Sequence, residues 1–377
     1  MDVSQLNRSR VNESRVNCSV LNASGFDGAC RRSRVPGIGA DIMKSMVLWY
    51  DIAKQGATNE SMAENPVLRD LSGNGHDATC YNFAWSGMSG VGGYSQNYNK
   101  KWYIDDTRVS ATVTNIQINV TSVLRTLIGV YYQSNSDEVA FTVPSYKVRV
   151  SGLTDGQAIT YRDGTSTVSY TIDRDGEYTL PQIDFSAQGG YYGFILNKVQ
   201  ESCNITIEQL PIYPHALVSD GVDDYCLAEG LPTLNDYTFF VDTSLSLNKL
   251  SSFYSRIVGK YSSNNKYDFL LFGTNRDTRP TNYGFITFNE DPVPYANFIT
   301  PISGINVATK DTFNGIDLDI VGKDYGDCDK LIFFAKKGND NLSDLGAYAL
   351  KTFILFNRTL TPEEIEWVKT NLIETEQ

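Results

Sequence analysis

The chain has 377 residues, 41% hydrophobic and 20% charged, which allows a sizeable core and excludes wholesale disorder. Its formal charge is −12, and because residues 1–46 carry seven basic and four acidic side chains, the rest holds −15. An acidic body argues against nucleic acid as a partner, since phosphate binding needs a basic face. The longest apolar runs are too short to span a bilayer, so we expect no membrane partner.

The opening thirty residues repeat with a period of five. The first position of each pentad is apolar, the second is Asp or Asn, and the fourth is Ser in five of six copies. This period resembles that of four-sided β-solenoids, and six copies give barely more than one coil. One coil cannot bury its apolar edge alone. We therefore predict that the repeat orders against a second copy or another protein; the alternative is a disordered tail.

A basic stretch rich in Gly and Pro, RRSRVPGIGAD (31–41), follows the repeat and is interpreted as a linker. With the pentads it makes up a predicted anchor over residues 1–45. The N-terminus also lacks the apolar segment of a signal peptide, which favours synthesis in a cytoplasm.

Residues 46–52 (MVLWYDI) predict an apolar strand, and DLSGNGHDATCYNFAW (70–85) predicts a turn with positive φ at Gly73 or Gly75. The turn matches the start of a calcium loop, but Tyr81 stands where that loop needs a bidentate Glu. A plain turn is therefore favoured.

Residues 103–212 predict short strands at roughly ten-residue spacing, typical of a small immunoglobulin-like sandwich. The apolar alternation of 109–113 slips before it resumes at 116–120, which indicates either a bulge or a new strand. Three Asp-Gly pairs, beginning at Asp155, Asp163 and Asp175, favour hairpins between neighbouring strands.

More strands are predicted over 213–356, and the chain ends with a helix signal. Thr361 is the expected N-cap, Pro362 stands at the first helical position, and Glu364 completes a capping box. Ile365, Val368 and Leu372 would form the apolar face of this helix.

Several of these motifs together resemble the laminin-G or concanavalin A-like jelly-roll family. They are the strand at 46–52, the turn DLSGNGHDAT, SDGVDDY with YTFFVD after it, and the closing ALKTFILFNRTLTPEEIEWV. The resemblance covers 46–102 and 213–377. It implies an all-β fold with a jelly-roll sandwich in two parts. Residues 103–212 have no counterpart in that family and are interpreted as an inserted immunoglobulin-like sandwich, and the pentad-repeat anchor at 1–45 precedes the first part.

The run from Trp49 to Gly90 resembles virion structural proteins of crAss-like phages that infect gut Bacteroides. This resemblance implies a head-fibre or decoration protein on the phage surface, anchored to capsid or other virion proteins by residues 1–45. We expect a homo-oligomer, with a trimer favoured over a dimer, and contact with host or mucosal glycans. The alternatives are a tail-associated fibre, a lectin that recognises a receptor, and, least favoured, a polysaccharide-degrading enzyme.

No catalytic, cofactor-binding or metal-ligating residue is assigned, and the chain is expected not to be an enzyme. The only histidines are His76, in a turn, and His215, beside the Pro211–Pro214 segment that is expected to rejoin the two domains, and neither has a serine-nucleophile motif nearby. The four acids Glu138, Glu201, Glu208 and Glu229 are isolated along the chain and are interpreted as surface acids.

Carbohydrate contact stays open, because sugars stack on exposed aromatic rings. The tryptophans Trp49, Trp85 and Trp102 are expected in the core. Asp220, Asp223 and Asp224 lie in a turn that calcium would fit, although water-facing charges are favoured there. The six cysteines include no C-x-x-C pair and are expected to be reduced, mostly buried thiols.

Overall fold

The computed structural model describes most of the chain from Ile38 onward. The described residues are 38–99, 102–104, 107–121, 128–133, 142–164, 168–184, 191–196, 202–245, 254–262, 266–274, 282–290, 297–299, 304–322, 328–337 and 342–373. The pentad repeat lies outside them, and so do Glu138 and Glu201.

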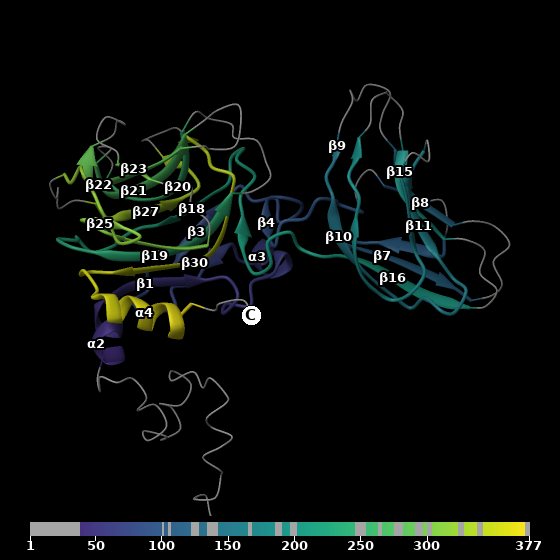
Figure 1. Cartoon of the computed structure of the whole chain (residues 1–377), viewed down its shortest axis with the longest axis horizontal. Helices are drawn as coiled ribbons and strands as arrows, with labels where there is room; N and C mark the ends of the chain where they lie inside the picture. The colour runs from purple at the N-terminus through teal and green to yellow at the C-terminus, as the bar shows by residue number, and fades with distance from the viewer. Residues whose placement is uncertain are drawn as a thin grey trace, which may run out of the picture.

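Two eight-stranded antiparallel sheets form what we call the first sandwich (Figure 1). One sheet has the order β26 (Ile316–Asp317), β25 (Thr312–Phe313), β24 (Gly304–Thr309), β19 (Thr238–Leu245), β30 (Tyr348–Phe356), β17 (Leu217–Val218) and β4 (Gly90–Val91), with β1 (Met46–Asp51) also paired to β30. The other has the order β2 (Val67–Leu68), β3 (Ala78–Tyr81), β18 (Tyr225–Ala228), β27 (Lys330–Phe333), β20 (Tyr254–Tyr261), β21 (Lys266–Thr274), β22 (Asn282–Glu290) and β23 (Asn297–Ile299).

The two sheets share a core that is rich in aromatic rings. Tyr50 of β1 packs edge-on against Phe333 of β27, with ring centroids 5.9 Å apart. Phe239 of β19 lies 4.6 Å from Phe269 of β21. Burying such rings between the two sheets stabilises the sandwich, because each removes a large apolar surface from water.

Two five-stranded antiparallel sheets form the second sandwich. One has the order β13 (Gly176–Leu180), β10 (Tyr146–Ser151), β16 (Cys203–Gln209), β7 (Asn115–Val120) and β6 (Val109–Ala111). The other has the order β12 (Ser169–Ile172), β11 (Ile159–Asp163), β15 (Tyr191–Leu196), β8 (Ile128–Gln133) and β5 (Trp102–Ile104). Two short ribbons complete the strands, β9 (Thr142–Val143) with β14 (Ile183–Asp184), and β28 (Lys336–Lys337) with β29 (Leu342–Ser343).

The predicted all-β class is confirmed. Strands from 46–91 pair with strands from 217–356, and those from 102–209 pair among themselves, as an insertion requires. The exact segment boundaries stay a prediction, and the core of the second sandwich also includes Tyr98.

Two segments of the chain connect the sandwiches, and backbone hydrogen bonds join these segments to each other. Ile212 N donates to Gly93 O and Gly92 N donates to Ala216 O, at 2.9 and 2.8 Å. Further along, the buried Gln209 side chain bonds the backbone of Gln96 twice: its Oε1 accepts from Gln96 N and its Nε2 donates to Gln96 O. These contacts tie the entry and exit of the second sandwich together.

Some of the local predictions in the second sandwich are confirmed, and others are wrong. The slip after residue 113 is a new strand, because β6 and β7 form a hairpin with Val109 opposite Ile118. Only the Asp163 pair lies in a hairpin, between β11 and β12. The pairs at Asp155 and Asp175 connect strands of different sheets, so the hairpin prediction is wrong there.

The predicted linker is partly helical, which corrects the interpretation of residues 38–41. Helix α2 (Ile38–Ser45) buries Ile42 and packs close to helix α4 (Pro362–Asn371), where Gly39 faces the Trp367 ring. A Cβ at Gly39 would lie 2.7 Å from that ring, so glycine permits the contact rather than breaking the helix. Figure 1 shows both helices below the sheet that contains β1.

The closing helix α4 begins as predicted. Thr361 accepts from Glu364 N, and the Glu364 side chain accepts from Thr361 N, which completes the capping box. Val368 and Leu372 are buried on the sandwich. A third helix, α3 (Asn59–Glu64), has a capping box of its own at Thr58. Among the described residues no helix is long and apolar enough to cross a membrane.

Candidate functional site

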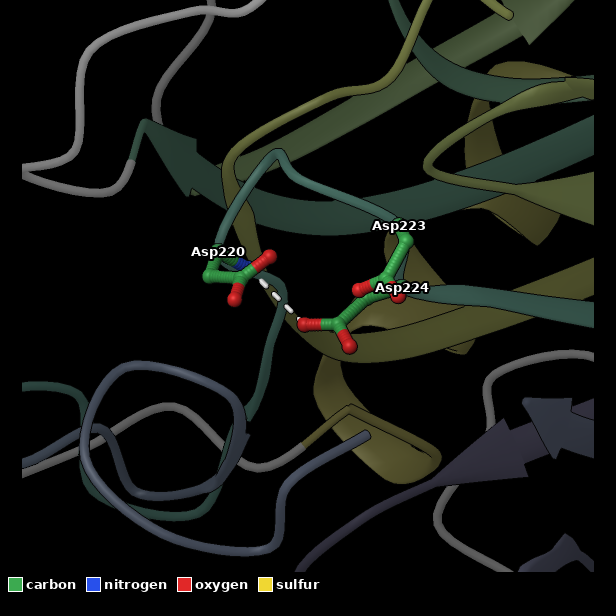
Figure 2. A group of neighbouring side chains, drawn as sticks. All are labelled: Asp220, Asp223 and Asp224. Atoms are coloured by element: carbon green, nitrogen blue, oxygen red, sulfur yellow. Dashed lines mark hydrogen bonds between the residues drawn. The ribbon is translucent and has the colours of Figure 1, made fainter. Parts of the chain in front are cut away.

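Three aspartates gather on the loop that leads into β18. Asp220, Asp223 and Asp224 each place a carboxylate oxygen within 4.8 Å of the others. Figure 2 shows the hydrogen bond that fixes the loop, from Asp220 N to a carboxylate oxygen of Asp224 at 2.9 Å. Asp220 in turn accepts from Val222 N at 2.8 Å. The loop thus folds around its own acids.

Asp224 is the buried member of this acidic loop, with 1% of its surface exposed. The hydroxyl of buried Ser89 donates to its Oδ1 at 3.0 Å. Burial raises the pKa of Asp224 to about 7, and the charges of Asp220 and Asp223 act in the same direction, while the hydrogen bonds from Asp220 N and Ser89 oppose them. Near neutral pH this carboxyl is therefore close to the midpoint between its protonated and charged forms.

Carboxylate oxygens are the ligands that hard divalent cations prefer. A cation beside Asp224 would replace its proton and offset the repulsion among the three acids. The acidic loop could supply part of such a coordination shell, with backbone carbonyls or water supplying the rest.

The other residues considered from the sequence have structural partners. Asp70 accepts from the backbone N–H of Trp49, Ser72 and His76, which explains the turn. Gly73 and Gly75 both have positive φ, as predicted.

Two of the expected surface acids form ion pairs, and the three tryptophans are buried or partly buried. Glu208 pairs with Arg149 at 3.0 Å and Glu229 with Lys330 at 3.5 Å. Trp49 is buried, as expected. Trp85 and Trp102 are partly buried and stack on aromatic neighbours.

A second feature, not foreseen from the sequence, is a row of three tyrosines across neighbouring strands of the second sandwich. Tyr103 of β5 lies 5.3 Å from Tyr131 of β8, which lies 5.6 Å from Tyr191 of β15, measured between ring centroids. Tyr103 is 46% and Tyr191 38% exposed, against 3% for Tyr192 on the inner face. We call these three residues the tyrosine ladder.

Glycines make room for the ladder. A Cβ at Gly193, opposite Tyr131 in the register, would lie 2.8 Å from Tyr131 Cβ and 2.2 Å from a backbone oxygen of β8. A Cβ at Gly164 would lie 2.6 Å from the Tyr191 ring. A larger residue at Gly164 would therefore collide with the Tyr191 ring, and one at Gly193 would collide with the strand that carries Tyr131.

The sequence does contain a signal for the ladder. Tyr131-Tyr132 and Tyr191-Tyr192 are doubled tyrosines within strands, and a strand turns successive side chains to opposite faces. One ring of each pair must therefore face outward.

No protein-family model matches the chain, and no curated protein matches it. Among solved structures, a Trypanosoma rangeli sialidase in complex with sialic acid matches over 71% of this chain and 62% of its own, with 9% identity and a TM-score of 0.32. The same sialidase with the inhibitor DANA gives 10% identity and a TM-score of 0.32 over the same shares. The N-terminal tandem domain from Paenibacillus barcinonensis Xyn10C matches over 73% of this chain and all of its own, with 11% identity and a TM-score of 0.16.

These matches correct one expectation. The first structures that match are those of an enzyme, so the expectation that the chain is not an enzyme is not retained. The chain spans 62% of that sialidase, and at 9% identity the likeness concerns β architecture and transfers no residue or reaction.

Proposed function

We propose that the chain is a glycan-contacting structural protein of a phage particle and that the tyrosine ladder is its contact surface. The observation that carries the glycan part is the ladder itself: three tyrosines on adjacent strands whose rings contact one another at tilted angles, two of them well exposed. Exposed aromatic surface of this kind marks interaction sites on otherwise polar proteins.

The chemistry of the ladder suits a sugar chain. The C–H faces of pyranose rings pack on aromatic faces, and a phenol hydroxyl can both donate to and accept from sugar hydroxyls. Successive ring centroids 5.3 and 5.6 Å apart match the length of a single sugar ring. In the neighbouring strand β11, Thr160 and Arg162 alternate with buried residues and therefore add polar groups on the outer face beside the rings. An extended oligosaccharide therefore fits better than a single sugar.

The phage setting rests on the sequence. The resemblance of 49–90 to virion structural proteins, and the prediction that the pentad repeat orders against a second copy or another protein, both favour a fibre or decoration anchored through residues 1–45. A head location and a trimer remain our choice over a tail location and a dimer. Negative-stain imaging of the full chain tests this: trimeric particles with bundled arms are expected, and monomers would contradict it.

A glycan array with the full chain tests the contact surface. Wild type is expected to bind a subset of oligosaccharides, and Tyr191→Ala is expected to lose that binding. Tyr81→Ala is the matched control, because Tyr81 is also 38% exposed but lies on the first sandwich, where it stacks on Tyr225.

The array is repeated with a chelator. Binding that survives chelation and Tyr81→Ala supports the ladder. The opposite result would refute the ladder and move the site to the acidic loop: Tyr191→Ala leaves binding intact, and Tyr81→Ala or the chelator abolishes it. Release of shorter sugars during the incubation would instead identify an enzyme.

A further inference from the structure

Two cysteines face each other inside the first sandwich. Cys80 of β3 and Cys226 of β18 are directly opposite in the register, and their Sγ atoms lie 2.6 Å apart. Both are buried, with 3% and 0% of their surface exposed. They are 146 residues apart in the chain, and the whole second sandwich lies between them.

The backbone around this pair has the geometry of a cross-strand disulfide. Cys80 N donates to Pro66 O at 2.7 Å, on the β2 side, so the polar backbone groups of Cys80 point away from β18. The two cysteines therefore form a non-hydrogen-bonded pair, in which Cα atoms lie about 4.5 Å apart and side chains are closest. A disulfide accepts Cα separations of about 4.4–6.8 Å. The register thus places the two cysteines where a disulfide can span the strands.

We propose that Cys80 and Cys226 form a reversible disulfide when the chain meets a low-molecular-weight disulfide. One cysteine thiolate attacks a sulfur of the small disulfide, forming a mixed disulfide and expelling one small thiolate. The second cysteine thiolate then attacks the protein-bound sulfur and expels the other. The protein loses two electrons and two thiol protons, and the small disulfide gains both to become two thiols.

The bond would join the two separated parts of the first sandwich. β3 belongs to the part before the second sandwich and β18 to the part after it. Because a disulfide restricts the unfolded chain more as the loop it closes grows, this long loop predicts a large stabilisation.

Burial controls when the reaction can occur. Burial raises the pKa of Cys226 well above its usual range, and the neighbouring thiol acts in the same direction. Since the thiolate is the reactive form, the closed sheet exchanges slowly. The only strand beyond β3 at this edge, within the described part of the sheet, is the two-residue β2, so brief opening of the edge or folding itself gives access.

Peptide mapping of the full chain tests the proposal. One sample of the chain is unfolded and refolded in oxidised glutathione, and a second in reduced glutathione. Free thiols are alkylated, and each digest is analysed without reduction. We expect one linked peptide pair that contains Cys80 and Cys226 and disappears after reduction. The thermal midpoint is expected to be several degrees higher in the oxidised sample than in the reduced one.

Variants separate this bond from other oxidation. Cys203→Ala is the matched control, because Cys203 is a buried cysteine of the second sandwich; it should keep the redox-dependent midpoint, and Cys80→Ala should lose it. Full alkylation of both cysteines after refolding in oxidised glutathione would overturn the proposal, as would a bond from either one to a different cysteine. If Cys80→Ala does not fold, the map of the wild-type chain decides alone.

Discussion

Replacing Asp224 by Asn should stabilise the chain above neutral pH. Asp224 has a pKa of about 7 in the fold against 3.8 for an exposed carboxyl, so the folded state holds its proton over a range where the unfolded state has lost it. A raised carboxyl pKa contributes stability that is present below pH 3.8 and is lost as the pH rises through about 7. Between pH 5 and pH 8 this linkage amounts to about 2.5 kcal/mol.

Asn fits the same hydrogen bonds. Its Oδ1 can accept from Asp220 N, as an Asp224 oxygen does now, and its Nδ2 can donate to the Ser89 hydroxyl. The change therefore removes the titration with little change of shape. The exposed Asp155, in a turn of the second sandwich, provides the control variant Asp155→Asn.

Urea unfolding at pH 5 and pH 8 measures the effect. The wild type should lose about 2.5 kcal/mol more than Asp224→Asn between the two pH values, and Asp155→Asn should follow the wild type. Equal pH dependence in wild type and Asp224→Asn would refute the claim that burial of this carboxyl controls its proton.

Three further changes test the packing, each by the free energy of unfolding. Thr361→Ala removes the capping box of α4 and should cost about 1 kcal/mol, whereas a cost near zero would mean that the cap is dispensable. Gly152→Ala forces a Cβ to 2.0 Å from Asn204 O at a φ of +91° and should cost about 2–4 kcal/mol; an unchanged midpoint would contradict that geometry. Lys260→Met removes the buried cation that pairs with Asp268 at 2.5 Å and should cost about 3–5 kcal/mol, more than Lys260→Met combined with Asp268→Leu; equal costs would show that the ion pair is not the cause.

The sequence predicts features that depend on local chemistry. The capping box at Thr361 and Glu364 and the glycine turn at Gly73 need only residues close in the chain, and the structure contains both. The β-sandwich class follows from strand alternation and turn residues, which are also local.

Local patterns cannot predict features that depend on which sheet each strand joins. Asp175 precedes a glycine as a hairpin residue would, yet its carboxylate accepts from Gly152 N and Leu153 N, on the connection that follows β10. The ladder is similar: a doubled tyrosine shows that one ring faces outward, but only the pairing of β8 with β5 and β15 lines up the outward rings. The same limit applies to Cys80 and Cys226, which become neighbours only through register.

The most direct test of the glycan surface is a titration of the best array oligosaccharide into the wild-type chain, Tyr131→Ala and Tyr81→Ala. Tyr131 is the middle ring of the ladder and contacts both of its neighbours. Loss of one stacked ring should weaken binding about tenfold, which corresponds to about 1.4 kcal/mol. The account predicts this loss for Tyr131→Ala and unchanged affinity for Tyr81→Ala; equal affinity of wild type and Tyr131→Ala would contradict it.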